Sequence, residues 1–391
     1  MNTRTQVRIC VHAITSAVCA VFLAFSFSGV SASAQEAATA EPYIKPALMD
    51  EGDWTLVVIP DPQAYSRYAR NQGIFELDTA WIAENKNTLN IQEVVCVGDL
   101  VESNDLQEAD GYFANQTSKQ MWNSVSNAFK RLDGIYPYVL CTGNHDYGPE
   151  IFPEGTHYGI RSSETRDTHF NEFFPATRNP AWKNVLVEMG TNAFGVKTLE
   201  NAAYELTVPN DKKILIVSLE FSPRDETLAW AREVFARPEY RGHFGIIVTH
   251  SYLLGTNRES ERIGQEGYGI SKAGGNGGIR IWEKLVNDTP NIRMVISGHV
   301  SESDDFSGCC GHRVVTNAAG RQVAEILFDT QAMGGGWEGN GGDGWLQLME
   351  FSPDMKRIRA RTFSPLFAIS PKSRNGAWSH EPCCEFEINL D

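Results

Sequence analysis

Short, continuous apolar runs alternate with amphipathic segments through the first part of the chain. The runs show no polar alternation, which is typical of strands buried on both faces; they lie at 54–59, 94–97 and 138–141. Between them, apolar residues recur every three or four positions, around 74–81 and 121–132, and this spacing predicts two helices. Strand and helix signals in alternation predict a parallel α/β sheet.

The later part of the chain repeats this pattern and then becomes rich in strand signals. Further buried runs lie at 214–219, 245–248 and 293–296, with helical spacing around 228–235 and 279–286. Residues 147–193 are rich in Gly, Pro, His and aromatic residues, and we interpret them as an insertion beside the candidate functional site described below. The part from about 312 to 391 is predicted to be β-rich. We expect 35–391 to form one domain with two packed sheets.

The N-terminal 34 residues have the features of a secretory signal peptide. Arg4 and Arg8 precede an apolar stretch that ends in the small residues Ala32-Ser33-Ala34. A retained membrane anchor is the alternative, but serines and a glycine interrupt the stretch. We therefore expect a chain exported to the periplasm or the extracellular space, with no stable membrane insertion after cleavage.

Composition and charge exclude several classes of protein. The chain is 42% hydrophobic and 21% charged, which is globular rather than disordered or fibrous. Its formal net charge of −15 argues against a nucleic-acid partner, because such partners need basic patches. Two adjacent cysteine pairs, Cys309-Cys310 and Cys383-Cys384, are plausible disulfide partners in an exported protein, with the connectivity open. Cys96 and Cys141 lie in apolar runs and are predicted core residues.

Polar residues with metal-binding side chains follow five of the buried runs. In chain order these are Asp61 with Gln63, Asp99, Asn144 with His145 and Asp146, His250, and His299. Because the carboxyl ends of parallel strands share one sheet edge, residues far apart in sequence can converge there. Carboxylates, amide oxygens and imidazoles suit divalent metals such as Mn, Fe, Zn or Mg. The set exceeds one tetrahedral shell, so two ions sharing a carboxylate are expected.

The order Asp-x-Gln, Gly-Asp, Gly-Asn-His-Asp, Thr-His, Gly-His resembles the calcineurin-like metallophosphoesterase superfamily. The likeness spans roughly residues 54–300. It extends through the C-terminal strands, which resemble those of secreted family members with an Asp-x-Gln first motif. The resemblance implies an α/β fold: a four-layer α/β/β/α sandwich with two mixed sheets. It also implies a two-metal site that hydrolyses a small phosphorylated substrate.

The resemblance also implies a role for each matching residue. Asp99 would bridge the two metals, and Asn144, His250 and His299 would complete the shell of one ion. Asp61 would serve the other ion, with Gln63 as a possible oxygen ligand. The phosphate would contact Asn144 and His145, and His145 would protonate the leaving group. Asp146 would hold the His145 imidazole in orientation.

Two departures from the usual family pattern fall on the same ion. Gln63 stands where the family usually has His, and Ser301 stands where it usually has the last His of Gly-His-x-His. Oxygen-only ligation at that ion favours Mn, Mg or Ca, and the site could be weak or empty. Nearby acids at 302, 304 and 305 are candidates to fill the gap.

Two alternatives to a fully active enzyme stay open, the first of them because of these departures. One is a metal- and phosphate-binding member without activity or with weak activity, and the other is an adhesive or scaffold protein at the cell surface. The choice between phosphomonoester and phosphodiester, the metal identity and the oligomeric state stay open at this point.

Overall fold

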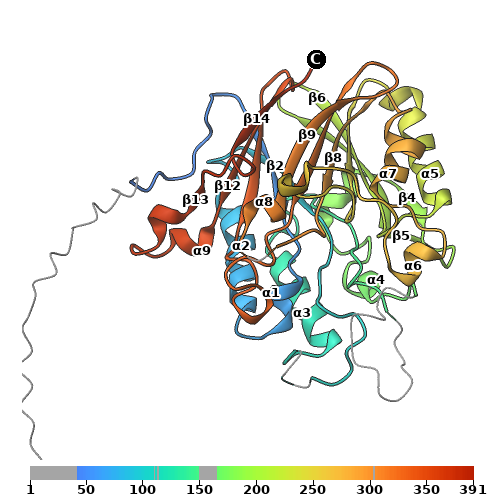
Figure 1. Ribbon diagram of the computed structural model, residues 1–391. Coiled ribbons are helices and arrows are strands. Elements are labelled where there is room, and N and C mark those ends of the chain that lie inside the picture. The colour runs from blue at the N-terminus through green and yellow to red at the C-terminus, as the bar shows by residue number, and fades with distance from the viewer. Residues whose placement is uncertain (1–41, 110, 112–113, 149–164, 303) are drawn as a thin grey trace, which may run out of the picture. The chain divides into compact units, whose positions relative to one another are not determined.

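The computed structural model describes residues 42–109, 111, 114–148, 165–302 and 304–391. The predicted signal peptide therefore lies outside the described residues, as does most of the first half of the predicted insertion. Within the described ranges the chain forms two seven-stranded mixed sheets with helices (Figure 1).

The first sheet has the order β13-β12-β11-β1-β2-β3, with β14 paired to β12. Its parallel part is β1, β2 and β3, and the remaining pairs are antiparallel. All six residues of β1 are buried, as expected for a strand covered on both faces. The strands are β1 (Trp54–Ile59), β2 (Ile91–Cys96), β3 (Val139–Leu140), β11 (Leu346–Phe351), β12 (Arg357–Phe363), β13 (Trp378–Ser379) and β14 (Phe386–Asn389).

The second sheet has the order β4-β5-β6-β7-β8-β10-β9. Strands β6, β7, β8 and β10 run parallel, and antiparallel strands close both edges. The strands are β4 (Leu186–Thr191), β5 (Lys197–Val208), β6 (Lys212–Ser218), β7 (Phe244–Val248), β8 (Ile292–Ser297), β9 (Cys310–Thr316) and β10 (Gln322–Phe328). The mixed two-sheet α/β architecture expected of the metallophosphoesterase sandwich is confirmed.

Helices cover the outer faces of the two sheets (Figure 1). Apolar residues of α2 and α3 join the large core that also fills the space between the sheets, while α5 and α7 pack in a second core on the β4–β10 sheet. The α-helices are α1 (Gln63–Arg67), α2 (Gln72–Glu84), α3 (Ser118–Phe129), α4 (Phe170–Phe173), α5 (Asp225–Ala236), α6 (Gly269–Lys272), α7 (Gly278–Ile281), α8 (Phe306–Cys309) and α9 (Pro365–Ala368). A π-helical turn, η5 (Trp282–Val286), continues α7, and short 3₁₀ turns are η2 (Pro180–Asn184), η3 (Pro238–Tyr240), η4 (Thr256–Arg258), η6 (Gly336–Glu338) and η7 (Arg374–Gly376).

The first predicted helix is present, but its buried face differs from the expected one. The apolar residues that marked it, Ile74 and Trp81 among them, are only half-buried. The fully buried positions include Phe75, Ile82 and the carboxylate of Asp78. The helix thus presents a face rotated by about one residue, and the Trp81 ring stacks on the Phe363 ring of β12 with centroids 4.9 Å apart.

The strand pattern also resumes earlier than expected. Strand β4 begins at Leu186, inside the range interpreted as an insertion, and pairs with β5 at the sheet edge. Upstream, the aromatic residues Phe170 and Phe174 are fully buried and pack against Trp122 of α3. From residue 165 onward, much of this region therefore belongs to the folded core.

The six described cysteines carry free thiols, so the expected disulfides are not formed in this structure. One cysteine of each adjacent pair nevertheless lies close to the other pair: Sγ of Cys384 is 3.8 Å from Sγ of Cys310. Cys309 instead contacts the Glu302 carbonyl oxygen through its thiol. Cys96 and Cys141 are fully buried, as predicted. No helix in the described ranges combines the length and apolarity that a bilayer span requires.

Candidate metal centre

The polar residues that follow the parallel strands gather at one edge of the two sheets. Asp99 lies three residues beyond β2, His250 two residues beyond β7, and His299 two residues beyond β8. Asn144 follows β3 and Asp61 follows β1 in the same way. Parallel pairing within each sheet aligns these strand ends, as expected from the sequence.

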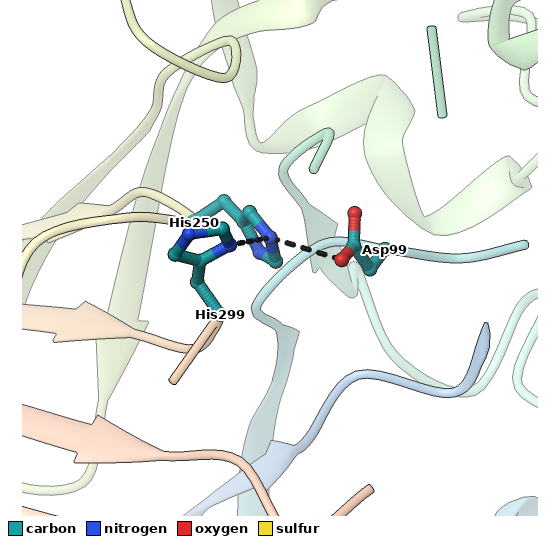
Figure 2. A group of neighbouring side chains, drawn as sticks. All are labelled: Asp99, His250 and His299. Atoms are coloured by element: carbon teal, nitrogen blue, oxygen red, sulfur yellow. Dashed lines mark hydrogen bonds and ion pairs between the residues drawn. The ribbon is translucent and has the colours of Figure 1, made fainter. Parts of the chain in front are cut away.

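His250 lies at the centre of the first group of side chains, which we call the histidine side: Asp99, Asn144, His250 and His299. Its Nε2 atom is 3.2 Å from Oδ2 of Asp99, 3.1 Å from Oδ1 of Asn144 and 3.1 Å from Nδ1 of His299. Figure 2 shows His250 between His299 and Asp99. The other ring nitrogen, Nδ1, lies 2.8 Å from the Val97 carbonyl oxygen, which fixes the ring orientation.

The backbone around this group is held in an unusual conformation. Asp99 and His299 have φ of 43° and 77°, in the left-handed region that non-glycine residues rarely adopt. Gly143 allows Asp99 to approach, because a Cβ atom there would lie 2.1 Å from Oδ1 of Asp99. Such strain is typical of functional sites, where the surrounding structure holds side chains in place.

The electrostatics of the histidine side suit a bound cation. Burial alone would raise the pKa of Asp99, but the imidazoles of His250 and His145 lower it to about 2. Burial opposes the charged form of His250, while Asp99 raises its pKa above the usual value. Ligand atoms of Asp99, His250 and His299 all lie within 4.8 Å of one another. A carboxylate and two imidazoles converging at this spacing fit a divalent transition metal.

His145 approaches the group from the loop after β3 and remains partly exposed. Its backbone N–H donates to Oδ1 of Asp99 over 2.8 Å, and its Nδ1 lies 2.6 Å from the Glu102 carbonyl oxygen. Burial would lower the pKa of His145, but the Asp99 and Glu102 carboxylates raise it. The imidazole is therefore oriented by a backbone carbonyl and favoured in its protonated form.

Asp146 has a different function in the fold from the one expected. Its carboxylate accepts hydrogen bonds from the backbone N–H groups of Gly143, at 2.8 Å, and Val101, at 3.1 Å. It thus ties together the loops that carry Asp99 and Asn144. The expectation that Asp146 orients the His145 ring is corrected, because the Glu102 carbonyl contacts Nδ1 of that ring.

A second group, which we call the oxygen side, consists of Asp61, Gln63, Asp329 and Gln331. Oδ2 of Asp61 accepts a hydrogen bond from the His299 N–H at 3.0 Å, and Oδ1 lies 3.9 Å from Nδ1 of His250. Gln63 lies beyond Asp61, where its amide donates to Oε1 of Gln331. Burial, followed by the Asp329 and Asp99 carboxylates, raises the pKa of Asp61 well above its usual value.

A sequence model described as calcineurin-like phosphoesterase matches residues 55–302. The chain belongs to this family. It is 25% identical over 349 residues to the uncharacterized protein YvnB of Bacillus subtilis (strain 168), covering 86% of this chain and 22% of that protein. The chain therefore spans less than a quarter of this relative's length. A solved structure titled GAP50, the anchor in the inner membrane complex of Plasmodium, superposes with a TM-score of 0.42 at 13% identity, covering 87% of this chain and 90% of that one.

In this calcineurin-like chain, Ser301, which stands where the family usually has a histidine, makes contacts within the fold. Its hydroxyl accepts a hydrogen bond from the Ala332 N–H at 3.1 Å and lies 3.5 Å from Sγ of Cys309. The neighbouring acids are also engaged elsewhere. Glu302 accepts from Asn257, Asp305 caps α8, and Asp304 lies 3.5 Å from the Gly335 N–H. These contacts do not support the expectation that one of the three acids fills the gap.

Three residues near the centre escaped the sequence interpretation: Asp329, Gln331 and Glu266. Asp329 directly follows β10, so the rule that found the other five strand ends would also have found it. Gln331 has no sequence signal of its own. Glu266 lies in a loop before α6, where its Oε1 is 3.3 Å from Nε2 of His299 and accepts from Ser251 at 2.6 Å. It adds a carboxylate that orients the His299 ring.

Aromatic rings pack against the histidine side of the centre. Phe221, which follows β6, lies with its ring centroid 5.8 Å from that of His250 and 6.0 Å from that of His299. The Tyr268 ring lies 5.9 Å from the His299 ring and 5.6 Å from the Phe221 ring. These contacts lower the local dielectric constant and strengthen the interactions of nearby charges.

Proposed function

We propose that this chain is an exported, metal-dependent phosphoesterase that uses water to hydrolyse a small phosphomonoester or phosphodiester. The observation that carries the proposal is the convergence of Asp99, His250 and His299 in a chain of the calcineurin-like phosphoesterase family. Because the family also includes inactive members, the catalytic step needs a direct test.

Two divalent ions would be held by the two sides of the centre. Asn144, His250 and His299 would hold one ion together with Asp99, and Asp61 with Gln63 would hold the other, Asp99 being shared. When bound, divalent cations supply an activated water nucleophile and neutralise charge on the phosphoryl group. The crowding of three polar atoms within about 3 Å of Nε2 of His250 supports a cation between them.

The chain's own side chains would then position the substrate and move a proton. Asn144 and His145 would contact the phosphate, since both lie on the loop that follows β3. With Nδ1 held by the Glu102 carbonyl, His145 can carry its transferable proton on Nε2. The raised pKa of His145 favours the protonated ring, which would donate that proton to the leaving oxygen.

Export is proposed from the first 34 residues, which have a basic start, an apolar centre and a small-residue exit. The site of action would be the periplasm or the extracellular space. Mass spectrometry of the protein recovered outside the cytoplasm should find an N-terminus near Gln35. A full-length chain retained in the cytoplasm would contradict this part of the proposal.

Turnover by a matched pair of aspartate variants tests the catalytic proposal. Asp99→Asn removes the shared carboxylate, and Asp211→Asn is its control, because Asp211 is exposed in the β5–β6 turn and also has a positive φ. After chelation and addition of Mn²⁺, we expect p-nitrophenyl phosphate or bis-p-nitrophenyl phosphate hydrolysis to fall at least about 10³-fold in Asp99→Asn only. Equal turnover in wild type and Asp99→Asn would overturn the proposal.

One specific observation favours a second candidate, a metal- and phosphate-binding protein without turnover. At the two positions where the family usually has histidine ligands, the side chains of Gln63 and Ser301 contact Gln331 and Ala332. The same assay distinguishes the candidates. A chain that binds Mn²⁺ and phosphate but hydrolyses neither a monoester nor a diester would support the second.

A further inference from the structure

Two buried oxygen atoms on the oxygen side accept no hydrogen bond from the described residues. They are Oδ1 of Asp61 and Oε1 of Gln63, and both side chains are at most 1% exposed. Buried polar atoms in folded proteins nearly always have a partner, so two orphaned acceptors on side chains two residues apart in sequence need an explanation. A cation is the natural partner for acceptor atoms that no donor reaches.

A buried carboxylate pair lies at the same place. Asp329 is fully buried, and its carboxyl group makes a side-chain contact with that of Asp61. A single amide nitrogen, Nε2 of Gln331, lies 2.9 Å from Oδ2 of Asp329 and 3.4 Å from Oδ2 of Asp61. The two carboxylates are therefore held together by a shared neutral donor.

The charge of this pair is not balanced by a lysine or arginine of the described part of the chain, and Nδ1 of His250 comes no nearer than 3.9 Å to Oδ1 of Asp61. The ion pairs of Asp61 and Asp99 are with His250, and no lysine or arginine in the described ranges forms one with Asp61 or Asp329. His250 is shared with Asp99, and burying two further adjacent negative charges beside one imidazole is strongly unfavourable. Either the two groups share a proton or a cation lies between them.

The geometry points to a cation held on the oxygen side by Asp61, Asp329 and Gln63, with Asp329 taking the place of the ligands lost at positions 63 and 301. This inference rests on the metal binding in the proposed function but not on turnover. Gln331 is a positioning residue, because its backbone N–H and its amide both donate to Asp329. The site would present oxygen atoms only, which favours Mn²⁺, Mg²⁺ or Ca²⁺ over Zn²⁺.

The chemical contrast with the histidine side predicts two classes of metal binding in one chain. The histidine side has two imidazoles and would retain Zn²⁺ or Mn²⁺, whereas the oxygen side would bind Mn²⁺ and release it to competing Ca²⁺. A protein whose two sites had the same kind of ligand would bind both ions with the same metal preference.

Titration of the metal-depleted full chain with Mn²⁺, followed by the electron paramagnetic resonance signal of free Mn²⁺, counts the sites without any substrate. We expect two bound equivalents in wild type. Asp329→Asn should retain one equivalent and bind the other on the order of 100-fold more weakly. Asp78→Asn is the matched control, because Asp78 is a buried aspartate on α2 outside both groups, and it should bind two equivalents.

A second variant keeps the test decisive if Asp329→Asn does not fold. Gln63→Glu adds a carboxylate where the orphaned Oε1 atom lies, and we expect it to bind the second Mn²⁺ equivalent at least about tenfold more tightly. Circular dichroism of each metal-free variant establishes whether it is folded. An unchanged second affinity in Gln63→Glu would overturn the inference.

The outcomes separate this inference from the proposed function. Two Mn²⁺ equivalents, one of them lost in Asp329→Asn, support the oxygen-side cation even if no phosphoester is hydrolysed. One equivalent in wild type, or two equal equivalents in Asp329→Asn, would overturn it even if turnover is high. Turnover with one bound ion would leave the proposed function standing without the oxygen-side cation.

Discussion

The histidine side and the oxygen side of the centre differ in what balances their buried charge. On the histidine side, Asp99 faces two imidazoles, and its pKa is lowered to about 2 despite burial. On the oxygen side, Asp61 faces Asp329, and burial together with that carboxylate raises its pKa. Imidazoles therefore face the buried carboxylate of the first side, whereas a second carboxylate faces that of the second side. The difference predicts that the two sides will respond differently to mutation and to metal removal.

Removing the central imidazole should have the largest effect on the histidine side. His250→Ala takes away the ring that contacts Asp99, Asn144 and His299 together. We expect kcat/KM for phosphoester hydrolysis to fall at least about 10³-fold, with loss of tight Zn²⁺ binding. His380→Ala, at an exposed histidine paired with Glu385, is the control. Retained Zn²⁺ affinity in His250→Ala would show that the histidine side is not the tighter site.

Removing the proposed proton donor should have a smaller effect that depends on the substrate. His145→Gln keeps a polar side chain but cannot carry a titrating proton. We expect hydrolysis of an alkyl phosphate to fall roughly 10²- to 10³-fold, and hydrolysis of p-nitrophenyl phosphate to fall much less, because its leaving group needs no proton. Equal losses for the two substrates, measured as kcat, would argue that His145 only positions the phosphate.

Neutralising an oxygen-side carboxylate should stabilise the metal-free chain and reduce its stabilisation by metal. In Asp329→Asn the buried carboxylate pair is reduced to one charge, so we expect the metal-free variant to unfold at a higher temperature than wild type at neutral pH. Added Mn²⁺ should raise the unfolding temperature of the variant less than that of wild type. A lower unfolding temperature without metal would indicate that Asp329 is a purely structural acceptor.

A buried carboxyl group outside the centre should leave metal binding unchanged, and it gives a reference for the comparison. Burial raises the pKa of Asp78 well above its usual value, and its Oδ1 accepts no hydrogen bond from the described residues. The folded chain therefore retains a proton that the unfolded chain releases near pH 4, and the free energy of unfolding falls as the pH rises above about 4.

Asp78→Asn should remove this pH dependence. Relative to wild type, we expect similar stability at about pH 4 and a gain at neutral pH that approaches about 1.4 kcal/mol for each pH unit over which the group would have titrated. Urea unfolding at several pH values measures the gain, with Asp211→Asn as the exposed control. A constant difference across that range would show that Asp78 ionises normally in the folded chain.

The sequence was sufficient for the strands that carry the centre and for the proximity of Asp99, His250 and His299. Buried runs at 54–59 and 245–248 became strands β1 and β7 with bounds within one residue, because continuous apolar runs have few alternative conformations. Asp61 and Asp99 are aligned because β1 and β2 pair in parallel, and His250 reaches them from the second sheet, which shares a core with the first. The α2 face was misjudged because Asp78 is buried at a position where the pattern predicts a polar surface residue.

The contacts of the oxygen side could not be read from residue order. Asp329 follows strand β10, but its significance depends on its contact with Asp61, 268 positions earlier in the chain. Gln331 and Glu266 lie in loops, and loop positions depend on tertiary packing rather than on periodicity. The role expected for Asp146 was wrong because backbone N–H groups compete for its carboxylate, and sequence patterns carry no information on such groups.

Anomalous diffraction from crystals of the full chain soaked in Mn²⁺ tests the central claim most directly, because it locates each ion without reference to turnover. We expect two peaks, one at coordination distance, about 2.0–2.3 Å, from Asp99, His250 and His299, and one at such a distance from Asp61 and Asp329. A single peak on the histidine side, or a second peak that Asp329 does not touch, would contradict it.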